Sequence, residues 1–288
     1  MRECTERSSE IGGKHVAKKN ASANEVATLS GDDERARQLA WVDLLVSAEA
    51  AGLLEAGASV DDVMRLDAAG ADLDDAGKAL PAGASVDDVM RLDAAGANLD
   101  DASKALTAGA SVDDAIQFRA AAGTLYGADE YMLAGGSIRS AIQLLKAGAD
   151  IGDAVAYLRK GGNCDDALRL LAVTQSLSGA DQFLTAGGSV DDALRLIAAG
   201  ADDLPAAATF LDSGGTVDDG LKILSVGGSL YGAAAILKAG GSIDEAIALH
   251  QGGATLSHAA EFLNAGGSVE EALNAEAQGI NLSTAAHR

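Results

Sequence analysis

Residues 176–201, SLSGADQFLTAGGSVDDALRLIAAGA, decide the fold of this chain. They divide into two halves of 13 residues, and each half places apolar side chains on the i, i+3, i+4, i+7 spacing of one helix face. Neither half shows the strict alternation of apolar and polar residues that is typical of a strand. Each half therefore predicts one short helix followed by a glycine-containing turn.

The same 13-residue unit recurs along most of the chain, with one extra residue, Asp202, that shifts its phase. Two kinds of unit alternate, so the true repeat has 26 residues. We call them A units, which resemble residues 189–201, and B units, which resemble residues 176–188, and number the positions in each from 1 to 13. Residues 59–84 and 85–110 differ at three positions only, which indicates a recent tandem duplication.

The ends of each predicted helix can be read from the unit. Position 1 is Ser, Thr or Asn in every A unit, and these side chains accept hydrogen bonds from the free N–H groups of a first helical turn. Nine of ten B units begin with Ser, Thr, Asn or Asp, which can cap in the same way, Val46 being the exception. Glycine at position 12 supplies the left-handed conformation that ends a helix. Each unit is thus a helix of roughly ten residues and a turn.

Helices of this length are not stable alone in water, so they must stack on their neighbours. We therefore expect an all-α fold, a two-layer α-solenoid of tandem 26-residue helix pairs with the shape of a long rod or arc, and a right-handed superhelix. Residues 1–31 are expected to form a disordered polar tail. Residues 32–58 would form the N-terminal cap helices, sealed by Trp41, and the first repeat, and residues 59–288 the tandem repeats. Pro81 should end its helix a turn early.

Charge excludes several classes of function. The chain has 43 acidic and 21 basic residues, a net charge of −22, which argues against direct binding of a nucleic-acid backbone. We expect no membrane span either, because the longest uncharged apolar stretch, residues 223–237, is broken by a Gly-Gly pair. Two cysteines cannot form a disulfide framework. The expected location is cytoplasmic, and secretion without a classical signal peptide stays as the alternative.

Paired carboxylates at positions 3 and 4 of the A units are the most distinctive feature. Acidic residues in a first helical turn favour the helix dipole, yet most B units lack the pair, so capping alone does not explain the asymmetry. Because all A helices of a solenoid begin along one edge, we expect an acidic edge there and a nearly neutral edge opposite. The acidic edge comprises Asp61, Asp62, Asp87, Asp88, Asp113, Asp114, Asp165, Asp166, Asp191, Asp192, Asp218, Asp219, Asp244, Glu245, Glu270 and Glu271; only Arg139-Ser140 interrupts it.

No catalytic constellation stands out, so we expect no enzymatic activity, no metal and no cofactor. His250 and His258 flank one turn, but no third ligand is placed near them by the sequence. Tyr126 and Tyr231 each lie in a Leu-Tyr-Gly-Ala sequence near the start of a B unit, where packing on the adjacent turn is favoured over a role as surface anchors.

The sequence favours a non-enzymatic protein–protein interaction scaffold whose acidic edge meets a basic protein. Other readings of the edge are a solvated surface that confers solubility, or a weak site for divalent cations. Two alternative functions are an acidic mimic of nucleic acid that sequesters a basic protein, and a secreted bacterial effector that binds a host protein. The sequence does not indicate the oligomeric state.

Overall fold

The computed structural model describes residues 42, 44 and 47–285, and this part is all-helical, without strands. Its helices are α2 (Ala48–Glu55), α3 (Val60–Ala69), α4 (Leu73–Ala79), α5 (Val86–Ala94), α6 (Leu99–Thr107), α7 (Val112–Ala122), α8 (Ala128–Leu133), α9 (Ile138–Lys146), α10 (Ile151–Arg159), α11 (Cys164–Thr174), α12 (Ala180–Thr185), α13 (Val190–Ala198), α14 (Leu204–Asp212), α15 (Val217–Ser225), α16 (Leu230–Lys238), α17 (Ile243–Gln251), α18 (Leu256–Asn264), α19 (Val269–Ala277) and α20 (Leu282–Ala285).

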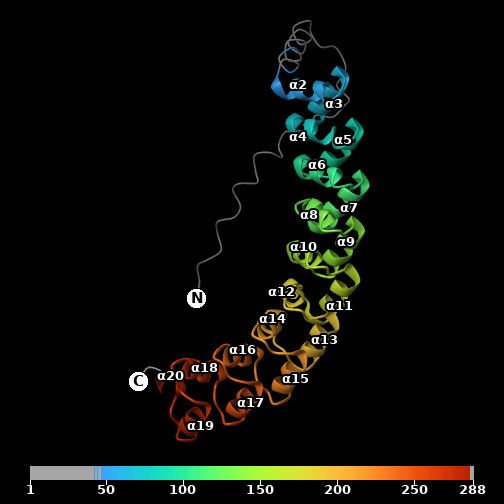
Figure 1. Ribbon diagram of the computed structural model, residues 1–288. Coiled ribbons are helices and arrows are strands. Elements are labelled where there is room, and N and C mark those ends of the chain that lie inside the picture. Colours follow the sequence, from blue (N-terminus) through green and yellow to red (C-terminus); the bar gives the residue numbers. More distant parts are fainter. Residues whose placement is uncertain (1–41, 43, 45–46, 286–288) are drawn as a thin grey trace, which may run out of the picture.

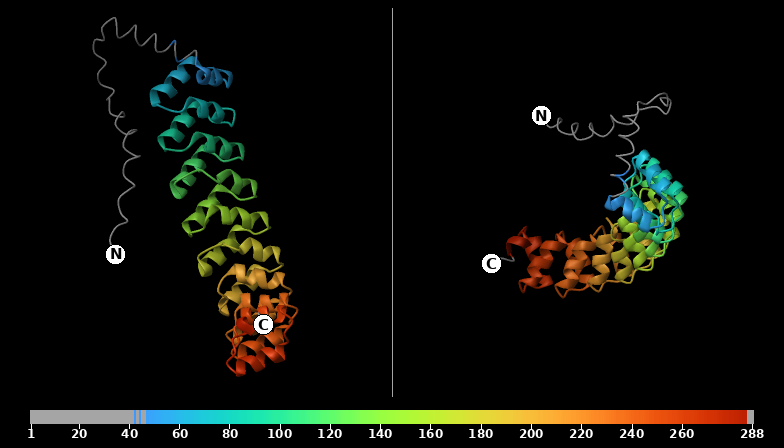
Figure 2. Two further views of the ribbon diagram at one scale, coloured as in Figure 1. Left: turned by 90° about the vertical axis from the view of Figure 1, so that its left-hand side faces the viewer. Right: turned by 90° about the horizontal axis from the view of Figure 1, so that it is seen from above.

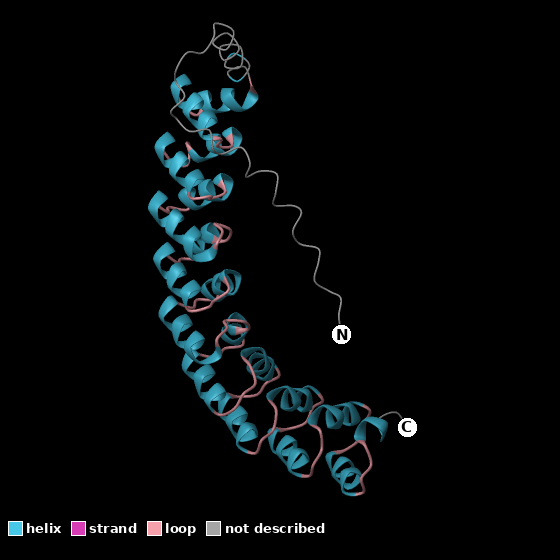
Figure 3. Ribbon diagram, turned by 180° about the vertical axis from the view of Figure 1, so that it is seen from behind, coloured by secondary structure: helices cyan, strands magenta, loops and turns pink. Residues whose placement is uncertain are grey.

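The helices form two layers that bend into an arc (Figure 1). A units supply the odd-numbered helices and B units the even-numbered ones. Each helix packs on the next one of its own layer, and most helices also pack on the next helix along the chain. The labels in Figure 1 place the even-numbered helices on the concave side of the arc. The same curved arrangement of helices is seen from one side and from above in Figure 2, and from behind in Figure 3. The predicted α-solenoid of helix pairs is therefore confirmed, while the right-handed sense of its superhelix stays a prediction.

The A helices begin as the sequence predicts. In each of them the side chain at position 1 accepts a hydrogen bond from the backbone N–H three residues later. In α13, for example, Ser189 Oγ accepts from Asp192 N at 3.2 Å, and the Asp192 carboxylate accepts from Ser189 N at 3.3 Å. This reciprocal capping box satisfies two donors that the helix itself leaves free.

Two B helices begin later than predicted. The A units before them lack glycine at position 12, so α7 and α11 continue to Ala122 and Thr174. The following helices α8 and α12 then begin after Gly127 and Gly179, at φ 82° and 78°. The expected caps Thr124 and Ser176 do not cap these helices, and no side chain does. At the first B unit, Ser47 caps α2 in place of Val46, one residue later than expected.

The structure also bears on Pro81, on the N-terminal residues and on the possibility of a membrane span. Pro81 does shorten its helix, because α4 ends at Ala79 whereas the equivalent α6 runs two residues further. The expected tail, residues 1–31, and Trp41 lie outside the described residues. In the described part no single helix has the length and apolar character needed to cross a membrane; α15 and α16 reach it only as a pair that bends by 120°.

Candidate interaction surface

The residues at position 4 of the acidic edge are bound to their own helix caps. Asp62 accepts hydrogen bonds from the Ser59 hydroxyl at 2.8 Å and from the Ser59 backbone N–H at 3.1 Å. These two bonds lower the pKa of Asp62, and the equivalent bonds from Ser85 lower the pKa of Asp88. Their first role is structural, since they keep the start of each A helix in place.

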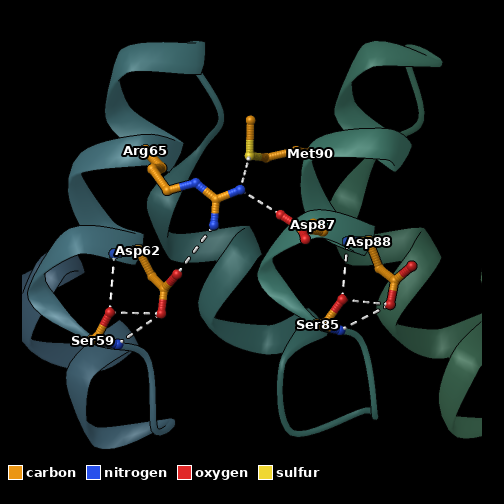
Figure 4. A network of polar contacts seen from close by, with 7 residues as sticks. All are labelled: Ser59, Asp62, Arg65, Ser85, Asp87, Asp88 and Met90. Carbon is orange, nitrogen blue, oxygen red and sulfur yellow. Dashed lines mark hydrogen bonds and ion pairs between the residues drawn. The ribbon is translucent and has the colours of Figure 1, made fainter.

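The residues at position 3 pair with a basic residue at position 7 of the preceding A unit. In Figure 4 the Arg65 guanidinium contacts Asp62 of its own helix and Asp87 of the next A helix. Arg91, Arg169 and Arg195 repeat this arrangement, and Arg169 lies 2.8 Å from Asp166 and 2.5 Å from Asp191. We call this series of ion pairs the arginine ladder. The ladder is a structural reason for the paired carboxylates that capping alone did not supply.

The arginine ladder is interrupted where position 7 is not basic. Gln143 and Ala248 occupy it before Asp165 and Glu270, and within residues 47–285 neither acid has an ion-pair partner closer than 4.0 Å. Lys222 contacts Asp219 at 2.8 Å but forms no ion pair within 4.0 Å with Asp244. At position 3, the acidic edge therefore consists of acids that are ion-paired with the ladder and of acids without a basic partner among the described residues.

Pairing does not remove the position-3 carboxylates from solvent. The side chain of Asp87 is 74% exposed and that of Asp218 is 79% exposed, although both contact an arginine. Exposed pairs of this kind contribute only about 0–1 kcal/mol each to stability. The acidic edge thus presents a row of accessible carboxylate oxygens, one from each successive A helix except α9, where Arg139 takes the position.

The opposite edge, where the even-numbered helices begin, is less neutral than expected. Asp74 and Asp75 are paired with Lys78, but around α10 to α14 the acids Asp150, Asp153, Asp181, Asp202 and Asp203 form no ion pair with any described residue. Burial raises the pKa of Asp153, and the nearby charges of Asp150 and Asp181 raise it further. A second concentration of negative charge therefore lies near the middle of the chain, and the B units did not reveal it because its members do not share one position.

The sequence also singles out two tyrosines and two histidines as candidate surface residues. Tyr126 is 69% exposed and Tyr231 46% exposed, so the expectation that both pack on the adjacent turn is wrong for Tyr126. Leu133, at the other end of α8, is 75% exposed as well. His250 lines an open groove with Tyr231, whereas His258 does not. Within the described residues no three His, Cys, Asp or Glu side chains gather as a metal site would need.

The fold and this surface define the class of protein as an all-α tandem-repeat solenoid. No known protein family, curated protein or solved structure matches the chain. Its function is therefore argued from its own geometry.

Proposed function

We propose that this chain is a protein-binding scaffold without enzymatic activity, and that its acidic edge meets a basic surface of the partner protein. The observation that carries this proposal is the row of exposed position-3 carboxylates, displayed by every A helix from α3 to α19 except α9. A regular row of charge steers an oppositely charged partner and fixes its register more than it adds raw affinity.

The acids without an arginine partner are the ones that a basic protein would find most available. Asp165, Asp244 and Glu270 are distributed over α11, α17 and α19, so a partner contacting all three would extend along much of the C-terminal half. None of them receives the cap hydrogen bonds described above for position 4, so changing them leaves the caps and the arginine ladder in place.

The test begins with the full chain immobilised and exposed to the proteins of the cells that produce it. A captured partner is purified, and its affinity is measured by calorimetry at low and high salt. We expect the affinity to fall steeply between 0.05 and 0.5 M NaCl, since exposed charges separated by more than ~10 Å are screened at about 0.1 M. The triple variant Asp165→Asn, Asp244→Asn, Glu270→Gln should bind roughly tenfold more weakly, at about 0.5 kcal/mol for each rim charge.

The matched control removes the same charge elsewhere. Asp67→Asn, Asp212→Asn and Glu261→Gln change three exposed acids that lie outside positions 3 and 4 of the A units and form no ion pair with a described residue. This control should bind within about threefold of the wild-type affinity. If the triple variant and the control variant lost affinity equally, only the net charge of the chain would matter. If both kept the wild-type affinity and that affinity did not depend on salt, the acidic edge would not be the contact surface.

The nucleic-acid mimic receives less support than a scaffold. A mimic needs an uninterrupted run of anions, whereas Arg65, Arg91, Arg169 and Arg195 alternate with the carboxylates of the edge and Arg139 interrupts it. The bacterial effector remains an alternative about location. Fusing residues 1–50 to a reporter and measuring its export tests that alternative separately.

A further inference from the structure

A pocket of about 300 Å³ lies beside the turns that join α11 to α12 and α13 to α14. Its wall is apolar where Val173, Ile197 and Pro205 contribute, and polar where Ser176 and Ser178 do. Thr174 and Leu204 also line it, and Asp202 and Asp203 add two carboxylates. A mostly apolar wall with a few charged groups at one place is the usual character of a binding site.

This pocket lies beside two irregularities of the repeat, one at Asp202 and one at Gln175. Asp202 is the one residue that breaks the 13-residue phase, and it lengthens the turn before α14. Gln175, which ends α11, has φ 59° and is the only non-glycine residue with positive φ in the described part of the chain. A side-chain-bearing residue in the left-handed region costs free energy, and such strain tends to occur at sites of function.

The charge of the pocket is uncompensated. Neither Asp202 nor Asp203 forms an ion pair with any described residue. Asp203 uses one carboxylate oxygen to accept a hydrogen bond from Ala206 N at 2.7 Å, as the cap of α14, and the other oxygen has no such bond. Asp202 is exposed and caps nothing. Two anionic groups thus lie next to the exposed side chain of Val173, which is 53% accessible.

We infer that this pocket binds a lysine or arginine side chain of the partner protein, an inference that rests on the proposed scaffold function. The alkyl stem of such a side chain packs on Val173, Ile197 and Pro205, and its cationic head lies between Asp202 and Asp203. Long basic side chains combine an apolar stem with a charged end, which is the combination that this lining presents. The head restores the charge balance that the two aspartates lack.

The probe is Nα-acetyl-lysine methylamide, titrated into the full chain while the methyl resonances of Val173 and Ile197 are followed by NMR. We expect saturable shifts with a Kd on the order of 1 mM, as befits a ligand of about a dozen heavy atoms. Nα-acetyl-arginine methylamide tests the second cationic side chain. Nα-acetyl-norleucine methylamide keeps the stem without the charge and should bind at least fivefold more weakly. Equal binding of the norleucine compound, or no saturable shift with either cationic compound, would overturn the inference.

The double variant Asp202→Asn, Asp203→Asn removes both charges and keeps the fold, because asparagine caps α6 and α11 in the same chain. It should reduce lysine-amide binding at least tenfold. The control Asp72→Asn, Asp150→Asn changes two other B-unit caps by the same charge and should leave binding unchanged. If the double variant binds the probe as wild type does, the pocket has another role.

Failure of this inference can be distinguished from failure of the proposed function. A partner that binds wild type and the Asp202→Asn, Asp203→Asn variant equally leaves the scaffold intact and removes the pocket from the interface. Specific binding of the lysine amide without any protein partner leaves the pocket intact and contradicts the scaffold.

Discussion

Side chains at positions 8 and 13 of a unit share one volume. Phe183 occupies position 8 of its B unit, and a Cβ on Gly188 at position 13 would lie 2.2 Å from its ring. Tyr131 and Gly136 repeat this pairing at 2.0 Å. The second glycine of each Gly-Gly pair in these units is therefore room for a ring. It does not end the helix, since that role belongs to the glycine at position 12, which has the positive φ.

The change Gly188→Ala should destabilise α12 by about 1–3 kcal/mol through overpacking. Gly188 has no positive φ, so the backbone itself accepts alanine. Adding Phe183→Leu should recover part of the loss, because Leu196 and Ala201 form that pair in the next A unit. Hydrogen exchange of the α12 amides measures the local effect, as repeat arrays need not unfold in one step. Strictly additive effects of the two changes would contradict the shared volume.

Two buried tyrosines at equivalent positions give a second prediction. Tyr131 donates a hydrogen bond to Ser140 Oγ at 3.1 Å, whereas the buried Tyr157 hydroxyl has no partner among the described residues. Tyr157→Phe should therefore raise the free energy of unfolding by about 1 kcal/mol, and the control Tyr131→Phe should lower it by a similar amount. Denaturant midpoints at pH 7 compare the two variants. A loss of stability in Tyr157→Phe would mean that its hydroxyl is bonded after all.

The raised pKa of Tyr157 predicts that the stability of the fold falls at alkaline pH. Burial raises the pKa of Tyr157 from its usual value of 10.0 to about 12. Because the folded-state pKa lies above the unfolded one, the free energy of unfolding has its full value below pH 10 with respect to this group, and it falls as the pH rises towards 12. The fall in midpoint over this interval should therefore be smaller in Tyr157→Phe than in the wild type, as thermal scans at each pH will show.

At the scale of whole helices, glycine weakens α4 but is required for the packing of α16. A Cβ on Gly77 in α4 would meet backbone atoms only at 4.0 Å, which is ordinary contact. A Cβ on Gly232 in α16 would lie 2.6 Å from Leu256 Cβ of α18, so glycine there lets two inner helices approach closely. Gly77→Ala should stabilise the chain by about 1 kcal/mol, and Gly232→Ala should destabilise it despite the same gain in helix propensity. Thermal midpoints of the two variants test this, and a shift of the same sign in both would refute the packing argument.

Helix boundaries show how far a single sequence predicts the elements. The A-unit caps and the glycine stops were predicted residue by residue, because both are local and depend on one side chain or one φ angle. The starts of α8 and α12 were not, because they depend on where the preceding A helix ends. That end is itself visible in the sequence, as Ala122 and Thr174 stand where other units have glycine.

Across the whole molecule, the acidic edge was predicted but its partners within the chain were not. Position 7 of the A units is basic in most repeats, yet only the stacking of A helix on A helix shows that Arg65 reaches Asp87, 22 residues later. The pocket at Asp202 was not predicted either, because an inserted residue indicates only a shift of phase in the sequence. Both features arise from contacts between units, which a pattern within one unit does not contain.

The nearly identical repeats 59–84 and 85–110 allow a test of modularity. Deleting residues 59–84 joins Ala58 to Ser85, and this junction reproduces the Ala-Ser sequence already present at every boundary between these units. Layers, caps and the arginine ladder then continue in register, with Arg91 in place of Arg65. We expect a shorter arc, seen by small-angle X-ray scattering, whose thermal midpoint lies within a few degrees of the wild-type value.

The matched comparison deletes residues 72–84 only. This deletion removes the single helix α4, whereas the deletion of residues 59–84 removes the pair α3 and α4. An A helix would then have to enter the inner layer, where α4 buries Ala79 but α5 would bring the larger Leu92. Such overpacking costs about 1–3 kcal/mol at a single site, and every later helix would exchange layers unless the array breaks at the deletion. We therefore expect the helices before the deletion to lose amide protection while those after it keep theirs. If both deletions left protection equally intact, the 13-residue helix and not the 26-residue pair would be the structural unit.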